Sequence, residues 1–479
     1  MTILRKTKIV ATLGPASNSE EVLNRMAEAG VDLVRLNFSH GTARDHVATA
    51  DLVREIAARH RRPIGVLCDL QGPKIRVGKF AEGKIQLAAG DAFILDAECK
   101  LGNQERVGLD YKTLPTEVEA GAILLLDDGR IVMTVRQVLG TEIHCVVDVG
   151  GSLSNNKGIN RKGGGLAAEA LTEKDKEDIK TAVALDADYI AVSFPRSGAD
   201  VQHARDLVRA AGGHAGIIAK VERAEAIDAL EEIIDASDAI MVARGDLGVE
   251  VGDAAVPGLQ KRMIRLARAR NKLVITATQM MESMITSPIP TRAEVSDVAN
   301  AVLDGTDAVM LSAESAAGKY PVEAILAMDR VCREAEKDFD SQNFKAKASK
   351  EFLRIDESIA MAAVHVAQHL KVKAIAALTE SGTAVMWLSR ANTLVPIYAL
   401  ASKKETRRKL TLFRGVYPYP FEQSTNDRDQ ILHDAEDELR MRGAVKDGDL
   451  ILLTIGEPVG VSGGTNTLKI VKVGEHRKS

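Results

Sequence analysis

Short apolar runs of β type alternate with helical patterns over the first 71 residues, and the same alternation returns from about residue 172. The early runs lie at 7–14, 32–39 and 64–70, with helical patterns at 19–29 and 44–60. The later runs lie at 189–194, 217–222, 239–243, 273–278 and 308–312, with helical patterns from 172 and at 199–211, 223–234, 258–270 and 292–303. Strands that alternate with helices are typical of a parallel sheet in an α/β fold.

Eight strands, each followed by a helix, predict a closed (β/α)8 TIM barrel. An open doubly wound sheet is the alternative, but eight regular units favour closure.

Between residues 73 and 165 the alternation stops, and short β-type runs appear at 85–87, 92–95, 122–126, 131–135 and 143–147. The sequence Asp-Asp-Gly-Arg at 127–130 is a strong hairpin signal. We therefore expect a small β-barrel domain at 72–168, inserted after the third barrel strand, with a glycine-rich, basic exit at 150–165.

The polar, charged segment 338–356 predicts a linker to a third domain. Beyond it come a helical pattern at 356–369, a strand at 374–379 and apolar runs at 396–400, 416–419, 450–454 and 468–473. The predicted division is therefore a barrel at 1–71 and 169–345, an inserted β domain at 72–168, and a smaller α/β domain at 346–479.

The 479 residues are 45% hydrophobic and carry a net charge of −4, which is ordinary for a soluble globular protein. That charge and an aromatic content of 3% argue against nucleic acid as the main ligand. No apolar run reaches the roughly 20 residues that span a bilayer, and the basic segment 1–8 lacks the apolar core of a signal peptide. The four scattered cysteines lack ligand or redox spacing, which favours reduced thiols in a cytoplasmic protein.

Lys220 and Glu222 end the apolar run 217–222. Side chains two residues apart on a strand point the same way, so the two groups face one region. A buried Lys and Glu each need a partner. The pair is either an ion pair that closes a core, or a phosphate-facing cation beside a metal-binding carboxylate.

Polar side chains gather where the predicted strands end, which is where barrel enzymes place their chemistry. A solvated rim is the simpler interpretation, but the mixture of cations, carboxylates and neutral donors weighs against it. The residues concerned are Arg35, Asn37, Ser39, Asp69, Lys220, Glu222, Arg244, Gly245, Asp246, Thr276, Thr278, Gln279, Ser312 and Glu314.

These residue types suit a metal ion and an anionic substrate. Glu222 and Asp246 come from adjacent strands and could share one Mg²⁺, which takes one or two carboxylates together with water and substrate oxygens. Gly245 allows close approach of the backbone, whose N–H groups bind anions at a helix start.

Lys220 beside such a metal would stabilise an enolate or a transferring phosphoryl group. Arg35 and Arg76 are candidates for phosphate, and Thr278 is a candidate proton donor. The residues therefore predict a Mg²⁺-dependent barrel enzyme with a phosphorylated small substrate.

The whole chain resembles pyruvate kinase, and the residues named above lie in the segments that carry the resemblance. The resemblance rests on six segments in order at strand ends: 35–41, 69–76, 218–222, 241–248, 277–284 and 309–315. The segments 158–165 and 170–175 resemble those of the bacterial form that AMP and sugar monophosphates activate.

The resemblance implies phosphoryl transfer from phosphoenolpyruvate to ADP, giving pyruvate and ATP. It implies that Lys220 stabilises the phosphoryl transition state and the enolate, and that Glu222 and Asp246 hold Mg²⁺, with Mn²⁺ as a substitute. The substrate carboxylate would bind Thr278 and the backbone N–H groups of Gly245 and Asp246.

The same resemblance assigns a second set of residues to the nucleotide and the phosphoryl group. These are Arg35, Asn37, His40, Arg76 and Lys157, although His40 is equally well interpreted as a structural turn residue. The inserted domain, which carries Lys157, would act as a lid that excludes water. The family also implies a homotetramer.

One departure from the family pattern concerns K⁺. Relatives that require K⁺ have Glu after the Gly-Pro of the third-strand motif, and Thr and Lys after its Asp; here these positions hold Lys74, Leu70 and Gln71. We hypothesise that the Lys74 ammonium replaces K⁺ at a position lined by Asn37, Ser39, Asp69 and the Leu70 carbonyl.

In the C-terminal domain, Thr379, Ser381, Gly382 and Thr383 lie between a strand and a helix. These groups either cap the helix or form a phosphate cradle. The family favours the cradle and makes this the regulatory domain, with the loop 456–465 closing over a sugar-phosphate or AMP effector.

Two rival functions agree less well with the sequence. A dikinase or phosphotransferase-system protein would relay phosphate through a histidine in a Gly-Thr-Ser-His setting, which is absent. A catalytically dead sugar-phosphate sensor would be expected to lose Lys220, Glu222 or Asp246, and all three are present.

Overall fold

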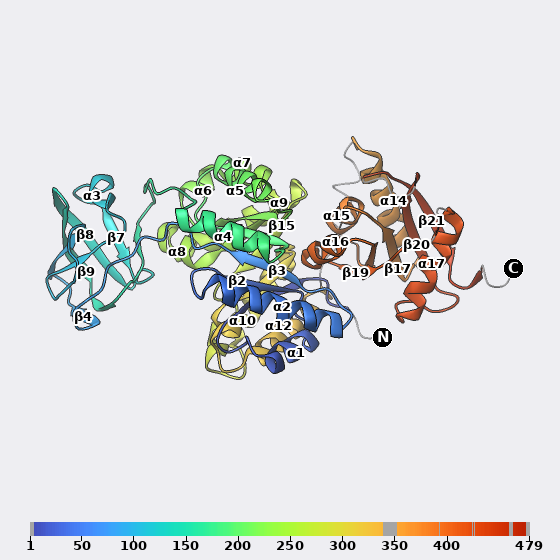
Figure 1. Ribbon diagram of the computed structural model, residues 1–479, viewed down its shortest axis with the longest axis horizontal. Coiled ribbons are helices and arrows are strands. Elements are labelled where there is room, and N and C mark those ends of the chain that lie inside the picture. Colours follow the sequence, from blue (N-terminus) through green and yellow to red (C-terminus); the bar gives the residue numbers. More distant parts are fainter. Residues whose placement is uncertain are drawn as a thin grey trace.

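The computed structural model describes residues 4–338, 352–391, 393–423, 425, 427–458 and 463–475. Three bodies follow one another along its long axis: the inserted β domain, the barrel and the C-terminal domain (Figure 1). Most of the predicted linker, with the boundary at 345, lies outside the described residues, as do residues 459–462 of the loop expected to close over the effector.

Eight parallel strands close into a barrel in the order β1-β16-β15-β14-β13-β12-β3-β2. The prediction of a (β/α)8 barrel is confirmed, and the open sheet is excluded. The strands are β1 Lys8–Leu13, β2 Leu33–Asn37, β3 Gly65–Asp69, β12 Tyr189–Val192, β13 Gly216–Val221, β14 Ala239–Ala243, β15 Leu273–Ala277 and β16 Ala308–Leu311.

Helices surround the barrel, and several begin at capping boxes that fix their first turn, as at Thr42, Thr172, Ser197 and Thr291. The predicted helix at 223–234 is instead two short helices, and a further helix follows β14 directly. The helices are α1 Glu20–Glu28, α2 Ala43–Arg59, α4 Glu173–Ala184, α5 Gly198–Ala210, α6 Glu225–Asp228, α7 Leu230–Ala236, α8 Arg244–Val251, η1 Asp253–Ala255, α9 Val256–Ala269, η2 Glu282–Ile285, α10 Arg292–Asp304, α11 Ala313–Ala316 and α12 Pro321–Ala335.

The barrel strands are buried on both faces, which explains why they are continuous apolar runs rather than alternating ones. One apolar cluster fills the interior, with Leu67, Ile218 and Met241 among its members. A larger cluster lies between the strands and the surrounding helices. Polar side chains are thereby confined to the two ends of the barrel.

The inserted domain has its own apolar core and two sheets, a six-stranded one (β11-β7-β8-β9-β5-β6) and a two-stranded one (β10-β4). The hairpin predicted at 127–130 joins β7 to β8. The glycine-rich exit forms two strands that sequence patterns did not predict, because their partners β4 and β7 lie far away in sequence. The elements are β4 Lys84–Leu87, β5 Ala92–Asp96, β6 Arg106–Gly108, α3 Leu114–Glu117, β7 Ile123–Leu126, β8 Ile131–Leu139, β9 Glu142–Val149, β10 Gly151–Ser154 and β11 Ile159–Arg161.

The C-terminal domain is a five-stranded sheet in the order β19-β18-β17-β20-β21, with an apolar core on each face. Only its last strand is antiparallel to its neighbour. The elements are α14 Ile355–His369, β17 Ala374–Leu378, α15 Thr383–Arg390, β18 Ile397–Ala401, α16 Lys404–Lys409, η3 Leu410–Leu412, β19 Val416–Pro420, α17 Arg428–Met441, β20 Leu450–Gly456 and β21 Thr465–Lys472.

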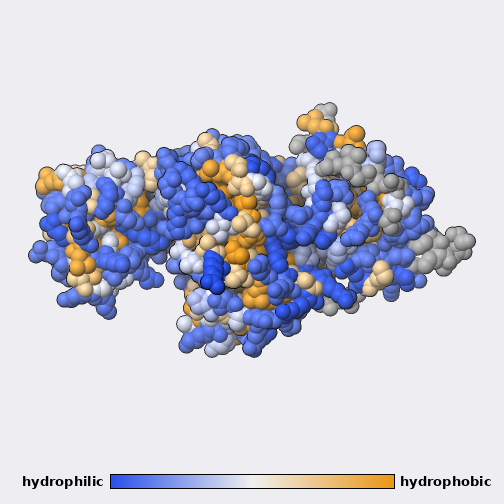
Figure 2. Space-filling model, viewed as in Figure 1, coloured by the Kyte–Doolittle hydropathy of each residue, from blue (hydrophilic) through white to orange (hydrophobic). Residues whose placement is uncertain are grey.

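The C-terminal domain is anchored to the end of the barrel where the strands begin. Arg408 Nε lies 2.7 Å from Oδ1 of Asp188, just before β12, and buried Arg390 pairs with buried Asp307, just before β16. In the view of Figure 2 most of the surface is hydrophilic, and hydrophobic residues gather mainly over the barrel. Among the described residues, no helix is both long and apolar enough to cross a membrane.

Candidate active site

The ammonium group of Lys220 lies at the centre of the rim where the barrel strands end. Its Nζ is 2.9 Å from Oε1 of Glu222 and 3.3 Å from Oδ1 of Asp69. It also donates to Oγ of Ser193, at 2.7 Å. Burial lowers the pKa of Lys220, but the Asp69 and Glu222 carboxylates outweigh burial and raise this pKa. Lys220 is therefore a permanent cation.

The structure shows Glu222 in an ion pair with Lys220, so both groups predicted from the run 217–222 face one region of the rim. The second oxygen of Glu222 accepts the Phe194 N–H at 3.0 Å. Burial raises the pKa of Glu222, Lys220 opposes this, and the negative charge of Asp246 adds to it, so that the pKa lies at about 6. Two carboxylates that repel one another in this way create a site that favours a cation.

Glu222 and Asp246 fit a Mg²⁺ site, since a buried and a partly exposed carboxylate that repel one another supply the hard oxygen donors that Mg²⁺ takes together with substrate oxygens. Among the residues that the structure describes, no group of three or more His, Cys, Asp or Glu side chains could hold a metal alone. Two carboxylates would leave the other positions of a Mg²⁺ octahedron to water and substrate oxygens.

Arg35 is fixed by two neighbours before any substrate binds. Its Nε donates to Oδ2 of Asp69 at 2.7 Å, and its Nη1 donates to Oγ1 of Thr12 at 3.0 Å. Burial raises the pKa of Asp69, but Lys220 and Arg35 outweigh burial and lower it. Asp69 is therefore an anion that holds both cations in place.

Thr278 lies in a constrained turn after β15. Thr278 and Gln279 have φ angles of +66° and +52°, in the left-handed region that costs a β-branched residue free energy. Arg244 holds the turn, because its Nη2 donates to the Thr278 carbonyl at 2.6 Å while its Nη1 contacts Asp297 at 2.7 Å. Gly245 is the second residue of α8, and its N–H donates a hydrogen bond of 2.9 Å to the Thr278 hydroxyl.

The structure does not place Lys74 at the position predicted for K⁺. Its Nζ donates to Oδ1 of Asp246 at 2.8 Å and lies 3.6 Å from Oδ1 of Asp128. In the described part of the chain, no hydrogen bond or ion pair joins Lys74 to Asn37, Ser39, Asp69 or the Leu70 carbonyl.

The groups predicted to line the K⁺ position have other partners in the structure. Asp69 is held by Arg35 and Lys220, and the Leu70 carbonyl accepts the Ser193 hydroxyl at 2.7 Å. The Asn37 side chain accepts the Ser39 N–H at 3.1 Å. Burial lowers the pKa of Lys74, but Asp246 outweighs burial and raises it, so Lys74 is a cation beside a predicted metal ligand.

Arg76 and Lys157, predicted for nucleotide phosphates, are held by groups of the inserted domain. The Arg76 Nη1 donates to the Asn156 carbonyl at 3.0 Å, and the Lys157 Nζ lies 2.6 Å from Oδ1 of Asp127. His40 is exposed, and its carbonyl contacts Nε2 of His46 at 2.9 Å. That contact, which the backbone of His40 makes, supports a turn role for this residue.

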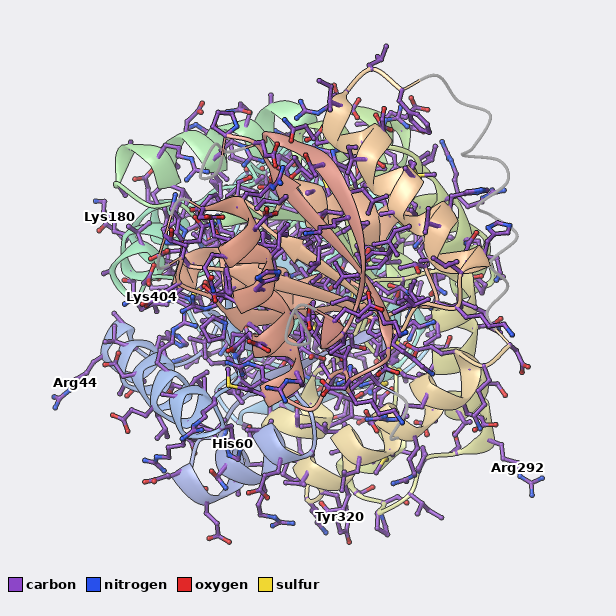
Figure 3. All side chains as sticks on the ribbon, turned by 90° about the vertical axis from the view of Figure 1, so that its right-hand side faces the viewer. Arg44, His60, Lys180, Arg292, Tyr320 and Lys404 are labelled. Carbon is purple, nitrogen blue, oxygen red and sulfur yellow. The ribbon has the colours of Figure 1, made fainter. Side chains whose placement is uncertain are left out.

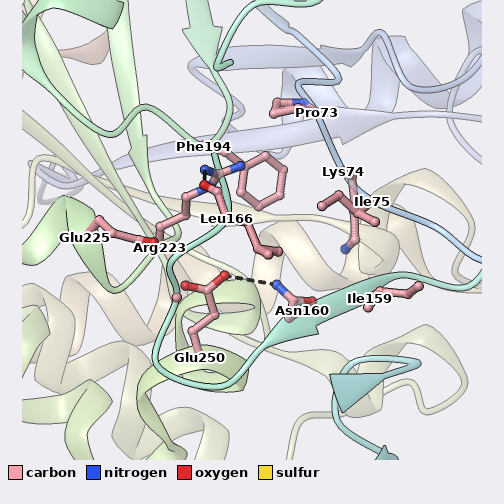
Figure 4. Close-up of a pocket in the computed structure, with 11 residues that line it drawn as sticks. Pro73, Lys74, Ile75, Ile159, Asn160, Leu166, Phe194, Arg223, Glu225 and Glu250 are labelled. Atoms are coloured by element: carbon pink, nitrogen blue, oxygen red, sulfur yellow. Dashed lines mark hydrogen bonds between the residues drawn. The ribbon is translucent and has the colours of Figure 1, made fainter. Parts of the chain in front are cut away.

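A small pocket lies between the inserted domain and the barrel, and Lys74 is among the residues that line it (Figure 4). Glu250, on α8, accepts the Asn160 amide of β11 at 3.2 Å and the Ala224 N–H, two residues after Glu222, at 2.9 Å. Burial raises the pKa of Glu250. One carboxylate thus links the outgoing segment of the inserted domain to both elements that carry the predicted metal ligands.

Sequence reasoning missed Thr12, Ser193, Asp297 and Glu250. Thr12 and Ser193 end predicted strands one and four, so extending the survey of strand ends to those two would have found them. Asp297 and Glu250 lie within helices, and no local pattern distinguishes them from surface carboxylates.

In the C-terminal domain, the predicted effector residues form one turn before α15. The Thr379 hydroxyl accepts the Gly382 N–H at 2.9 Å, and the Ser381 and Thr383 hydroxyls lie 2.9 Å apart. Gly382 has a φ angle of +87°, which only glycine adopts without strain. A pocket beside this turn also touches Gly456 and Thr465, the ends of the loop expected to close over an effector.

A closed (β/α)8 barrel whose strand ends carry a fixed Arg, a partly buried Lys and a pair of Mg²⁺-type carboxylates defines a class of phosphoryl-transfer enzymes that bind polyanions. Comparison with known proteins narrows this class. The family model "Pyruvate kinase, barrel domain" matches residues 4–325, and "Pyruvate kinase, alpha/beta domain" matches residues 357–471. The chain therefore belongs to the pyruvate kinase family.

Individual relatives agree along the full length. Pyruvate kinase II of Salmonella typhimurium is 54% identical over 476 residues, covering 98% of this chain and 99% of its own. A pyruvate kinase of Haemophilus influenzae is 53% identical, covering 95% of this chain and 96% of its own. A crystal structure of a pyruvate kinase from Cryptosporidium parvum has a TM-score of 0.91 at 35% identity, covering 98% of this chain and 96% of that one.

Proposed function

We propose that this chain transfers the phosphoryl group of phosphoenolpyruvate to ADP, with Lys220 as the central catalytic group. The observation that carries the proposal is the position of the Lys220 ammonium, 2.9 Å from Glu222 and 3.3 Å from Asp69 at the barrel rim. In the reaction a β-phosphate oxygen of ADP attacks phosphorus, the bond to the enol oxygen breaks, and the enolate of pyruvate takes a proton at its terminal carbon.

Lys220 would meet the equatorial oxygens of the transferring group and the developing enolate oxygen, where a fixed cation in a dry site has most effect. Arg35, fixed by Asp69 and Thr12, would orient the phosphoryl group. Glu222 and Asp246 would hold Mg²⁺, or Mn²⁺ in its place, which supplies charge neutralisation of the phosphoryl oxygens when bound.

The substrate carboxylate would bind at the start of α8, where the N–H groups of Gly245 and Asp246 are in the first turn. The carboxylate would take the place of the Thr278 hydroxyl as the acceptor of the Gly245 N–H. The freed Thr278 hydroxyl would then stand in the proton path to the enolate. Arg76 and Lys157 would bind ADP as the inserted domain closes and excludes water.

The regulatory part of the proposal rests on the turn before α15. Thr379, Ser381, Gly382 and Thr383 would cradle the phosphate of a sugar-phosphate or AMP effector. We further propose a homotetramer in the cytoplasm, in line with the family, with a barrel divided at 1–71 and 169–345 by the inserted domain.

A coupled assay tests the catalytic proposal. Pyruvate formation from phosphoenolpyruvate and ADP should require Mg²⁺, and Lys220→Met should lower turnover at least about 1,000-fold, or roughly 4 kcal/mol. Lys180→Met, at an exposed position on α4 (Figure 3), is the matched control and should keep full turnover. Normal turnover by Lys220→Met would remove the assignment.

A further inference from the structure

A cavity of about 360 Å³ lies between the barrel and the C-terminal domain, at the opposite end of the barrel from Lys220. Small-molecule sites span roughly 300–1,000 Å³, so this interdomain cavity is large enough for a ligand. Its barrel side is formed where β12, β13 and β15 begin and where α5 and α9 end. Its other side is formed by α15, α16 and the segment that follows α16.

The C-terminal side of the interdomain cavity is apolar and aromatic. Met386, Trp387 and Phe413 line it and are only partly buried, unlike the surrounding core. Partly exposed aromatic rings in a concave site offer a flat surface to a planar group.

The barrel side of the cavity is cationic. Arg209 and Lys272 line it, as does Arg270, which is already paired with Glu231 and Asp235. A further cation, Lys409 of α16, lines the cavity from the C-terminal side. The lining carboxylate, Asp238, is engaged by Arg205 at 2.8 Å and by the Ile217 N–H at 2.7 Å.

The two lysines of the cavity have no carboxylate partner of their own among the described residues. Lys409 Nζ donates to the His214 carbonyl at 2.5 Å, and Lys272 Nζ donates to the Asp235 and Ser237 carbonyls at 2.9 and 2.6 Å. Burial lowers both pKa values; nearby arginines lower them further, and Asp238 only partly opposes this. An anion in the cavity would meet an incompletely neutralised positive field.

We propose that the interdomain cavity binds a planar aromatic anion, with its ring against Trp387 and Phe413 and its charged group toward Lys272 and Lys409. The Asn271 side chain lines the same cavity and supplies a further polar group. The site goes beyond the proposed phosphoryl transfer, because it lies at the end of the barrel where strands begin. Ser381 lines this cavity and also the pocket beside the effector turn, so a bound anion would touch the regulatory segment.

The experiment uses 2-naphthoate and its neutral counterpart 2-naphthamide as probes. Calorimetry with the full-length protein should give a dissociation constant of about 1 mM or tighter for the acid, and at least about tenfold weaker binding for the amide. Trp387 is the only tryptophan, so protein labelled with 5-fluorotryptophan has one ¹⁹F signal. That signal should shift saturably with the acid. Acid and amide of equal affinity, or an unmoved signal, would overturn the proposal.

The Lys272→Gln and Lys409→Gln double variant should bind 2-naphthoate about tenfold more weakly than the natural protein. Lys404→Gln is the matched control, since Lys404 lies on α16 but at the exposed periphery (Figure 3). If the double variant does not fold, Arg209→Gln, at an exposed position, replaces it and should weaken binding severalfold. Unchanged affinity in the folded variant would overturn the assignment of the anion site.

Discussion

The Lys74 ammonium lies 2.8 Å from Oδ1 of Asp246, so a residue of the segment leading into the inserted domain is tied to a proposed Mg²⁺ ligand. Lys74 therefore places a fixed positive charge next to the metal site without occupying the position predicted for K⁺. We hypothesise that this charge makes K⁺ unnecessary.

The K⁺ prediction can be tested with tetraalkylammonium as the counter-ion. Natural protein should lose less than about tenfold in turnover without K⁺. A loss of about 100-fold, or roughly 3 kcal/mol, would contradict the hypothesis that K⁺ is unnecessary. Lys74→Met should lose about tenfold or more in K⁺-free buffer, because Asp246 loses its partner, and added KCl should restore part of it. Lys79→Met, exposed in the inserted domain, is the control.

A second prediction concerns the link between Glu250 and Asn160. Asn160→Ala removes a buried hydrogen bond to a carboxylate, worth about 1–2 kcal/mol. Backbone hydrogen exchange at 159–165 should then rise about fivefold to 30-fold, and the Michaelis constant for ADP should increase. Asn103→Ala is the control, since the Asn103 side chain accepts hydrogen bonds from the backbone N–H groups of Glu105 and Arg106, within the inserted domain. Unchanged exchange at 159–165 would contradict the link.

A third prediction concerns pH and Lys8. Burial lowers the pKa of Lys8 to about 8, although Asp32 opposes this, and the ordinary value is 10.5. The unfolded chain therefore binds more protons between pH 8 and pH 10.5, so the destabilising contribution of Lys8 is complete below pH 8 and fades as pH rises.

Lys8→Met removes this titration, so a comparison of the variant with the natural protein isolates the contribution of Lys8 to stability. The melting temperature of Lys8→Met relative to the natural protein should fall steadily from pH 8 to pH 10. Met keeps the apolar stem of Lys8 but cannot donate to the Val416 carbonyl. This loss changes the melting temperature by an amount that does not vary with pH. A difference independent of pH, measured by differential scanning fluorimetry, would refute the depressed pKa.

A fourth prediction concerns the effector turn. Ser381→Asp adds a negative charge where a phosphate is proposed to bind, and should abolish activation by sugar phosphates or AMP. Basal turnover at saturating phosphoenolpyruvate should not change, because Ser381 is in the C-terminal domain. Ser381→Ala is the matched variant without charge and should keep partial activation. Equal activation of Ser381→Asp and the natural protein would exclude this turn as the effector site.

The sequence by itself determined the elements and their order, because burial on both faces and helix capping act over a few neighbouring residues. The apolar run 217–222 became β13 with only small changes at its ends, and the signal at 127–130 became a hairpin. It also brought Lys220, Glu222 and Asp69 to one rim, since parallel strands of a closed barrel end on the same side.

Only the tertiary structure decided which charged groups meet. Lys74 pairs with Asp246, 172 residues away, and Glu250 bonds to Asn160, 90 residues away. The strands β10 and β11 exist because β4 and β7 offer them hydrogen-bonding edges. Such contacts depend on where whole domains come to rest, and pairing energies between residues distant in sequence leave no periodic trace in the chain.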